Sequence, residues 1–545
     1  MTVERGRKML VNTKKRIRDR ILSAHWDRRD DADFHRFQMT REQVKATQSQ
    51  LRGYIVMPGD PEYDTDRQLF NPVFDAYPSM IVYCAVESDV AQALKLASDA
   101  TQPFALRSSG HCTAGFSAGS GILIDVSMLN DVYVDAANLV ASAACACPFS
   151  KLTEALQAQG MHVPVGECED VCVAGFMQGG GYGFTSVAFG MNCDNVIDMR
   201  VMLADGSIVT ASRELNYDLW WAMRGGTGGT FGVLLSVRYR LRALGDVFGW
   251  AVIWPLETEQ DMQNATGALL ELQANFMLRN AAPLMTTQVS LCYQPGIQGG
   301  SPPGVDMRPF LMARGLYAGD GDAGQAIIAP LCALPGAMTQ WTATSDFNDL
   351  NVRLLNEPYG MPSFPAGTSW PCEDKTARYV ARDLAPEEWR AMLELFKRTP
   401  NQYSYAYLEF YGGAINAYPR QDSAFIHRDA AFDIVLDVFW LVEAEKPAAV
   451  AFLEEWIALI EPMSNGHIYQ NYPRLDQDEY AWRYWDDAHA GLYAVKLKYD
   501  PGQAFRFAQC VPPLMGPDGG LGPVIILPPA LQKALDQPIE YGYAK

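Results

Sequence analysis

A run of three consecutive glycines, Gly179 to Gly181, stands within the segment GFMQGGGYG (175–183) of this chain. Consecutive glycines lose much backbone entropy on folding and readily adopt positive φ, so they are tolerated where a bulky group lies against bare backbone. The pattern matches neither the GxGxxG motif of a dinucleotide-binding βαβ unit nor the GxxxxGK[ST] motif of a phosphate-binding loop. The run therefore predicts close contact between a large group and the main chain, outside those two motif classes.

A second cluster of small residues begins where the apolar run 104–106 leads into RSSGH (107–111). Successive backbone N–H groups can converge in such a turn and bind a phosphate without a nearby cation. Glycine-rich turns between strands are more often only turns, so the cluster alone leaves a phosphate site and a plain turn both open. His111 alone is likewise compatible with an ordinary loop histidine and with a cofactor ligand.

The 545 residues, 48% of them hydrophobic, exceed what one core usually organises, so at least two packed modules are expected. The formal net charge of −19 opposes binding to phosphate backbones and anionic lipid, which argues against nucleic acid and membrane partners. No stretch approaches the roughly 18 consecutive apolar residues of a spanning helix, and the basic N-terminus lacks the apolar core of a secretory signal. A cytoplasmic location follows as the expectation.

The 11 cysteines form no CxxC pair, so we predict no metal site and mostly buried thiols.

The predicted fold class is α+β. Short Val/Ile-rich runs alternate with glycine clusters and helical segments, and from about residue 247 longer helices, such as one over 448–460, alternate with strands of period two. The expected boundaries are 1–63 for a charged N-terminal extension, 64–246 and 247–465 for two α+β domains, 466–513 for a short aromatic-rich segment, and 514–545 for a tail.

Two strands of the second domain carry polar groups at alternate positions. In 403–411 the alternation places four tyrosines and Glu409 on one face, which is more aromatic surface than a solvated face needs. In 432–443 one face is apolar, and the other carries Asp433, Asp437, Phe439 and Glu443. For this second polar face, solvent exposure and a binding surface are equally favoured.

The order of motifs along the chain resembles the vanillyl-alcohol-oxidase superfamily of FAD enzymes, and in particular its berberine-bridge-enzyme-like branch. The N-terminal motifs that carry the resemblance are RSSGH (107–111), GECEDV (166–171), GGGYG (179–183), DN (194–195), ADG (204–206) and DLWWAMRGG (218–226). The C-terminal ones are FYGG (410–413), HR (427–428), NYP (471–473) and KYDP (498–501). The resemblance spans about residues 64–513. It implies a PCMH-type FAD-binding domain and a second α+β substrate domain whose antiparallel sheet covers the flavin.

The resemblance also implies FAD attached at two points, through His111 to the 8α-methyl carbon and through Cys168 to C6 of the flavin ring. Both carbons are electrophilic, and imidazole nitrogen and thiolate are strong side-chain nucleophiles. The predicted cofactor-binding residues are Arg107, Ser108, Ser109, Gly110, His111, Cys112, Gly115, Cys168, Val171, Gly175, Gly179, Gly180, Gly181, Gly232, Val233 and Tyr472. The chain departs from the family pattern at Ser109 and Cys172, where glycine is usual.

For catalysis, the resemblance implies Tyr472 as the base that accepts the substrate proton. The ordinary tyrosine pKa of about 10 is too high for this role at neutral pH, so Tyr472 needs a hydrogen-bonded acceptor or a nearby positive charge. Glu409 matches a position where sugar-oxidising relatives carry a carboxylate that assists the tyrosine. Glu443 is a reserve candidate for the base, with a structural role as its alternative.

The function implied is oxidation of the CH–OH or CH–NH group of an alcohol, sugar or natural product, with O₂ as the electron acceptor and hydrogen peroxide as product. Val171 supports an oxidase, because in the resembling family a valine three positions after the linked cysteine accompanies oxygen reactivity and a larger residue accompanies its loss. One alternative is a dehydrogenase of the same fold with another acceptor. The other is a non-catalytic carbohydrate-binding flavoprotein, which would not need His111 and Cys168 at this spacing.

Overall fold

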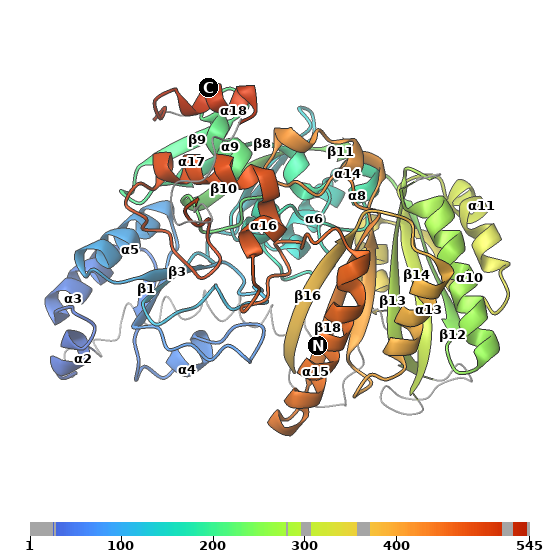
Figure 1. Cartoon of the computed structure of the whole chain (residues 1–545). Helices are drawn as coiled ribbons and strands as arrows, with labels where there is room; N and C mark the ends of the chain where they lie inside the picture. Colours follow the sequence, from blue (N-terminus) through green and yellow to red (C-terminus); the bar gives the residue numbers. More distant parts are fainter. Residues whose placement is uncertain are drawn as a thin grey trace.

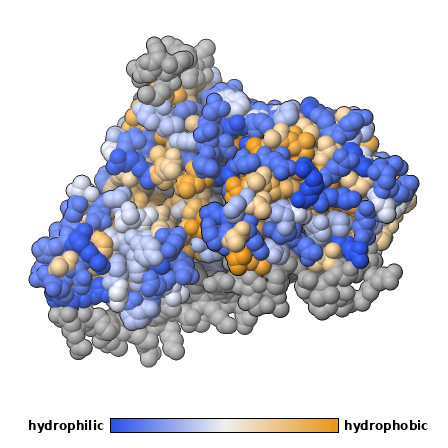
Figure 2. All heavy atoms as spheres, turned by 60° about the horizontal axis from the view of Figure 1, so that its bottom comes forward, coloured by the Kyte–Doolittle hydropathy of each residue, from blue (hydrophilic) through white to orange (hydrophobic). Residues whose placement is uncertain are grey.

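The computed structural model describes residues 26, 29–278, 282–295, 307–356, 371–514 and 527–541. Two lobes lie side by side, one built from the N-terminal and C-terminal parts of the chain and one from the middle part (Figure 1). The face in Figure 2 is mostly hydrophilic, with apolar residues gathered toward its middle. Within the described residues, no helix combines the length and apolar character needed to cross a bilayer.

The first sheet of the N-terminal lobe is mixed. Its strands lie in the order β1 (Tyr54–Val56), β2 (Met80–Tyr83), β4 (Ile122–Asp125) and β3 (Phe104–Arg107). Strands β2, β4 and β3 are parallel, and β2 and β4 are apolar runs because both of their faces are buried. Helices α3 (Arg41–Gln50) and α5 (Glu87–Asp99) pack together beside this sheet. The RSSGH turn therefore leaves the carboxyl end of the parallel strand β3.

The second sheet of this lobe is antiparallel, in the order β5 (Val132–Asp135), β6 (Val140–Ala144), β10 (Val233–Arg240), β8 (Val196–Met202) and β9 (Ile208–Ser212). Between β6 and β8 the chain forms α6 (Phe149–Gln157), the GECEDV turn, α7 (Val173–Gln178) and α8 (Ser186–Phe189). Helix α9 (Tyr217–Ala222) follows β9. This connection brings the segment with Cys168 beside the turn that carries His111.

The second lobe is a seven-stranded antiparallel sheet covered by helices. The order is β15 (Met338–Ser345), β12 (Val247–Pro255), β14 (Met307–Tyr317), β13 (Met285–Pro295), β17 (Tyr405–Phe410), β18 (Phe432–Trp440) and β16 (Cys372–Val380). Its helices are α10 (Glu259–Phe276), α11 (Gly321–Cys332), α12 (Phe347–Asn356), α13 (Pro386–Phe396) and α15 (Lys446–Ile460). Apolar residues of β17 and β18 pack with α13 and α15 in one core. The alternate side chains of these strands face the other lobe.

After α15 the chain returns to the first lobe through α16 (Tyr480–Trp485), α17 (His489–Tyr499) and α18 (Pro529–Leu535). The Lys498 ammonium lies 2.6 Å from the Asp218 carboxylate at the start of α9, and the Tyr499 hydroxyl donates to the same carboxylate. The described part of the predicted tail is not loose, because Leu531 is buried and the Glu540 backbone N–H donates to Asn216.

The expected charged extension also differs from the structure. Phe34, Met39 and Val44 are buried in the core of the first lobe, and β1 pairs with β2 in antiparallel register. Residues 29–56 are therefore an integral layer of this lobe, and a boundary at residue 63 falls after its first strand. The helix expected over 448–460 is confirmed, within the longer α15.

A buried histidine next to α12 makes the fold sensitive to acid. The Nε2 atom of His162 lies 2.8 Å from the Thr185 hydroxyl, the Phe347 ring lies edge-on to the imidazole, and burial lowers the pKa of His162 to about 3. The unfolded chain takes up this proton near pH 6.5 and the folded chain only near pH 3, so the free energy of unfolding falls as the pH drops through this window.

We expect this one group to cost about 2–3 kcal/mol of stability between pH 7 and pH 4.5. Urea unfolding at the two pH values measures the loss. A His162→Gln variant is expected to lose less stability on acidification than the wild type, whatever its stability at pH 7. Equal losses in the two proteins would mean that His162 is not the group responsible.

Candidate active site

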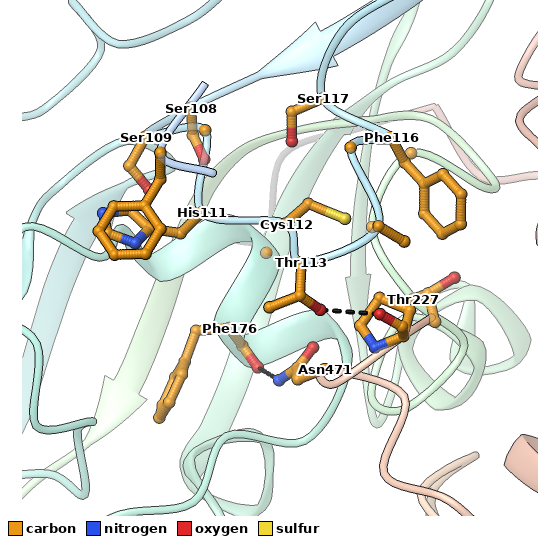
Figure 3. A pocket seen from close by; sticks show the side chains of 18 of the residues that line it. Ser108, Ser109, His111, Cys112, Thr113, Phe116, Ser117, Phe176, Thr227 and Asn471 are labelled. Carbon is orange, nitrogen blue, oxygen red and sulfur yellow. Dashed lines mark hydrogen bonds between the residues drawn. The ribbon is translucent and has the colours of Figure 1, made fainter. Parts of the chain in front are cut away.

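A cavity of about 730 Å³ lies between the two lobes, a size typical of small-molecule and cofactor sites. Figure 3 shows the turn 108–117 along one wall, with Phe176 and Asn471 opposite it. The structure brings most of the predicted cofactor residues to this cavity: Arg107, Ser108, Ser109, Gly110, His111, Cys112, Gly115, Cys168, Val171, Gly175, Gly232, Val233 and Tyr472 all line it.

A buried ion pair anchors the turn that carries His111. The Nε atom of Arg107 donates to the Asp125 carboxylate at 2.5 Å, between neighbouring parallel strands, and the two side chains are 6% and 2% exposed. Gly110 and Gly115 have φ of +80° and +73°, which lets the chain reverse direction beside the cavity. Arg107 therefore fixes the base of the turn, while the small residues above it form the cavity wall.

Gly175 leaves bare helix backbone against the cavity. A Cβ atom added at this position would meet no other protein atom within 4 Å, although Gly175 lies inside α7. The space over this part of the helix therefore belongs to the cavity, and a large planar group can approach the main chain there.

The three consecutive glycines have a different role from the predicted one, because Gly179, Gly180 and Gly181 do not line the cavity. A Cβ atom at Gly179 would lie 2.0 Å from the Asn471 side-chain oxygen, and one at Gly180, where φ is +125°, would lie 2.7 Å from the Phe425 ring. The large groups that approach this backbone are thus side chains of the same protein. The structure thus brings these three glycines against side chains of the same protein and not to the cavity.

Asn471 connects the glycine run to the active site. Its amide donates to the Phe176 carbonyl at 2.9 Å and to the Tyr469 hydroxyl at 3.0 Å, and the Tyr469 hydroxyl also accepts the N–H of Gly181. This network holds the NYP turn against the end of α7. Tyr472, the next residue, lines the cavity as a result.

The segments that carry His111 and Cys168 meet beside the cavity. The Cys172 backbone N–H donates to the Ser109 hydroxyl at 3.3 Å, so the two positions at which glycine was expected are hydrogen-bonded to each other. The Cys172 thiol donates to the Ala146 carbonyl at 3.2 Å. Burial raises the pKa of the Cys168 thiol to about 12, and the carboxylates of Asp170 and Glu167 add to this shift.

The opposite wall contains a tyrosine–carboxylate pair. The Tyr472 hydroxyl donates to Oε1 of Glu409 at 2.9 Å, and Glu409 is only 3% exposed. Its other oxygen, Oε2, is buried and has no hydrogen-bond partner among the described residues. Burial raises the pKa of Glu409 well above its usual value, and the nearby carboxylates of Asp433 and Glu167 raise it further. Burial and the charge of Glu409 also raise the pKa of Tyr472, so Tyr472 keeps its proton as the donor of this pair.

The sheet face around this pair is closed to solvent. Tyr405, Tyr407 and Glu409 of β17 line the cavity together with Asp437 and Phe439 of β18. In register, Tyr405 pairs with Asp437 and Glu409 with Asp433. The alternative of a solvent-exposed face on β18 is wrong, because its residues are buried throughout the strand.

Lys375 of β16 was not predicted from the sequence. Its ammonium lies 3.0 Å from the Asp437 carboxylate, and the two side chains are 13% and 2% exposed. It also lies 4.9 Å from the centre of the Tyr472 ring. Burial alone would lower the pKa of Lys375, but the Asp437 carboxylate and Tyr405 outweigh it and raise the pKa, so the side chain stays charged. Tyr472 thus has both an acceptor and a nearby positive charge.

Glu443 does not belong to this site. It follows β18 in a short 3₁₀ turn, its side chain is 81% exposed, and its carboxylate lies 3.6 Å from the Lys446 ammonium. The strand ends at Trp440, so the alternation that was expected to carry Glu443 to the polar face stops before it. The reserve assignment of Glu443 as the base is therefore wrong.

Comparisons with known proteins agree with the fold and the cavity. A family described as "FAD binding domain" matches residues 78–212, and one described as "Berberine and berberine like" matches residues 468–512. An uncharacterised FAD-linked oxidoreductase of Bacillus subtilis is 26% identical over 85% of this chain and 99% of its own. A carbohydrate oxidase of Microdochium nivale is 25% identical over 87% of this chain and 96% of its own. The solved structure of the berberine-bridge-enzyme-like protein 1 of Physcomitrella patens superposes with a TM-score of 0.75 at 22% identity, over 86% of this chain and 99% of that one.

The fold is thus the α+β fold of PCMH-type FAD-binding proteins, as predicted. The chain carries an FAD-binding domain and a berberine-like C-terminal segment, and over most of its length it is similar to FAD-linked oxidoreductases. The cavity fits FAD in chemical terms: it combines a turn of small residues, bare backbone at Gly175, and the two nucleophilic side chains of His111 and Cys168.

Proposed function

We propose that the chain is an FAD-dependent oxidase of a CH–OH or CH–NH group in an alcohol, sugar or natural product. The observation that carries this proposal is the Tyr472–Glu409 hydrogen bond of 2.9 Å, which lies in the same cavity as His111 and Cys168. Bound FAD supplies the acceptor for a hydride from the substrate carbon and passes the two electrons to O₂, giving hydrogen peroxide.

In this proposal His111 and Cys168 hold FAD by two covalent bonds, to the 8α-methyl carbon and to C6 of the flavin ring. Both residues line the cavity, and the segments that carry them are hydrogen-bonded through Ser109 and Cys172. Attachment at two points retains the flavin without a protein lid over it. The cavity wall formed by β17 and β18 would then be available to a bulky substrate.

Tyr472 and Glu409 would remove the substrate proton in two linked transfers. The Tyr472 oxygen accepts the proton of the substrate hydroxyl or amine while its own O–H proton passes to Oε1 of Glu409. The raised pKa of Glu409 suits this role, since a base works best when its pKa lies near the operating pH. The Lys375 ammonium, 4.9 Å from the Tyr472 ring, stabilises negative charge that builds up on the phenol oxygen.

The remaining wall indicates what kind of substrate fits. Tyr405 and Tyr407 stack with ring centres 5.2 Å apart, and Phe439 lies beside Tyr405. Aromatic faces of this kind bind sugar rings and planar aromatic compounds alike. Buried acceptor atoms without partners among the described residues, Oε2 of Glu409 and Oδ1 of Asp437, would take hydrogen bonds from substrate hydroxyls. Together with the similarity to a carbohydrate oxidase, this favours a polyhydroxylated substrate.

A dehydrogenase is the second candidate, and Cys172 is the observation that favours it. In the resembling family a valine at the Val171 position accompanies oxygen reactivity, but the neighbouring Cys172 side chain also lines the cavity, at a position where that family usually has glycine. A single added methylene can fill a passage that is only as wide as a small molecule. The identity of the electron acceptor therefore depends on these two neighbouring side chains.

The oxidase proposal predicts rapid reoxidation of the substrate-reduced enzyme in aerated buffer, with stoichiometric peroxide. Val171→Leu is expected to slow this step and to leave the rate of flavin reduction nearly unchanged, because the added methylene blocks oxygen and not substrate. Stopped-flow absorbance after mixing with air measures the reoxidation rate. Slow reoxidation of the wild type that Cys172→Gly restores would instead identify a dehydrogenase.

A further inference from the structure

A carboxylate just outside the cavity contacts the predicted attachment histidine. Oδ2 of Asp170 lies 3.3 Å from Nε2 of His111, and the two side chains are 28% and 16% exposed. Asp170 comes from the GECEDV turn and His111 from the RSSGH turn, so the contact joins the two segments that carry the predicted flavin links. Asp170 is not among the residues that line the cavity.

The contact defines which nitrogen of His111 is free. Burial alone would raise the pKa of Asp170. The hydrogen bond to His111 and the positive charge of the protonated imidazole outweigh burial and lower the pKa, so the carboxylate is ionised at neutral pH. An ionised carboxylate only accepts hydrogen bonds, so in the neutral imidazole, the form that can attack, the contact favours the hydrogen on Nε2 and the lone pair on Nδ1. The Phe70 ring stacks on the imidazole with ring centres 4.4 Å apart, which restricts rotation of the ring.

We propose that Asp170 is the positioning residue for attachment of FAD through His111. This inference rests on the covalent attachment proposed above. Asp170 fixes the imidazole with Nδ1 as the nucleophile and takes up the Nε2 proton when Nδ1 is alkylated. In the net reaction, one C–H bond of the 8α-methyl group and one imidazole N–H bond are replaced by one N–C bond. The two protons and two electrons released pass to dioxygen, giving hydrogen peroxide.

The Asp170 carboxylate favours the link through His111 but disfavours the link through Cys168. A cysteine must become a thiolate to attack the flavin ring, and the charge of Asp170 adds to the burial that raises the pKa of Cys168. Removal of this charge should therefore impair the histidine link and spare or favour the cysteine link. A residue that only stabilised the fold would affect both links together.

The test separates the two links by mutation. In a Cys168→Ser background, only the link through His111 can form, and protein produced under flavin limitation is incubated with FAD and then denatured in acid. Retained absorbance and intact mass give the rate of covalent attachment. We expect Asp170→Asn to slow this rate by roughly 10- to 100-fold, the range found when a carboxylate partner that orients a metal-binding histidine is removed. Asp170→Glu, which keeps the carboxylate, is expected to retain most of the rate.

Two controls make the outcome specific. Glu169→Gln removes the same charge one residue away and is expected to leave the rate unchanged, because in the structure Asp170 and not Glu169 contacts the His111 imidazole. In a His111→Ala background, where only the cysteine link can form, Asp170→Asn is expected to attach flavin at least as well as its parent.

Three results would be decisive in the other direction. Attachment at the parent rate in Cys168→Ser/Asp170→Asn would overturn the role of Asp170. Loss of the cysteine link as well in His111→Ala/Asp170→Asn would also overturn it, since Asp170 would then be needed for folding or FAD binding in general. Absence of any adduct in the Cys168→Ser parent would instead refute the His111 link itself, which belongs to the proposed function.

Discussion

Acid-denatured wild-type protein is expected to retain its flavin, with a mass increase equal to one FAD, and the His111→Ala/Cys168→Ala double variant is expected to release it completely. Each single variant should keep the flavin through the remaining link, because both residues line one cavity and a single covalent bond survives denaturation. Precipitation in acid followed by absorbance of the pellet and the supernatant measures the distribution. Intact-protein mass spectrometry measures the adduct.

A matched control for this experiment is Cys112→Ala. Cys112 lies in the next position after His111 and also lines the cavity, but it is not a predicted attachment point. Its variant should retain flavin as the wild type does. Free FAD in the supernatant of denatured wild-type protein would contradict covalent attachment altogether, and retention by the double variant would place the link on another residue.

Tyr472→Phe is expected to slow anaerobic reduction of the flavin by substrate on the order of 10²-fold or more, the usual effect of losing general-base catalysis. The substitution removes the oxygen that accepts the substrate proton and the hydrogen bond to Glu409, but keeps the ring. The flavin absorbance spectrum should change little. Stopped-flow measurement at saturating substrate gives the rate directly.

Glu409→Gln should produce a similar loss, because an amide cannot take up the proton from Tyr472. In the wild type, the rate of reduction should fall in acid as Glu409 becomes protonated, at a pH above the usual range for glutamate because the pKa of Glu409 is raised. Tyr403→Phe serves as the control, since Tyr403 precedes the same strand and does not line the cavity. Wild-type reduction rates in Tyr472→Phe would show that another group is the base.

The local parts of the site were predictable from the sequence because short motifs set them. The RSSGH turn and the GECEDV turn each place their predicted cofactor residues at the cavity. One turn directly follows strand β3 and the other directly precedes helix α7, so the neighbouring element fixes where each turn lies. The pairing of Tyr472 with Glu409 was also expected, through the family resemblance. The structure shows the hydrogen bond that the pairing requires.

Features that depend on distant strand pairing were not predictable. Lys375 faces Tyr472 only because β16 pairs with β18 in a register that sets Lys375 opposite Asp437. Nothing near Lys375 in the sequence indicates this pairing. The misassignment of Glu443 has the same origin, because the alternation of a strand gives no information on where the strand ends.

The glycine run shows a different limit. Its composition correctly indicates that large groups press against the backbone, but composition cannot tell a cofactor from a side chain. Asn471 and Phe425, which occupy that space, lie more than two hundred residues further along the chain. The contact between Asp170 and His111 was also not predictable, because it depends on two turns that meet only in the folded protein.

Anaerobic mixing of the yellow protein with a panel of sugars, aromatic alcohols and polycyclic natural products, followed by admission of air, tests the proposed activity most directly. An FAD-dependent oxidase predicts that at least one compound bleaches the flavin absorbance near 450 nm without oxygen, and that air restores the absorbance with one hydrogen peroxide per flavin. Binding of such compounds, detected by perturbation of the spectrum or by calorimetry, with no bleaching by any of them would contradict the proposed activity and identify a binding protein.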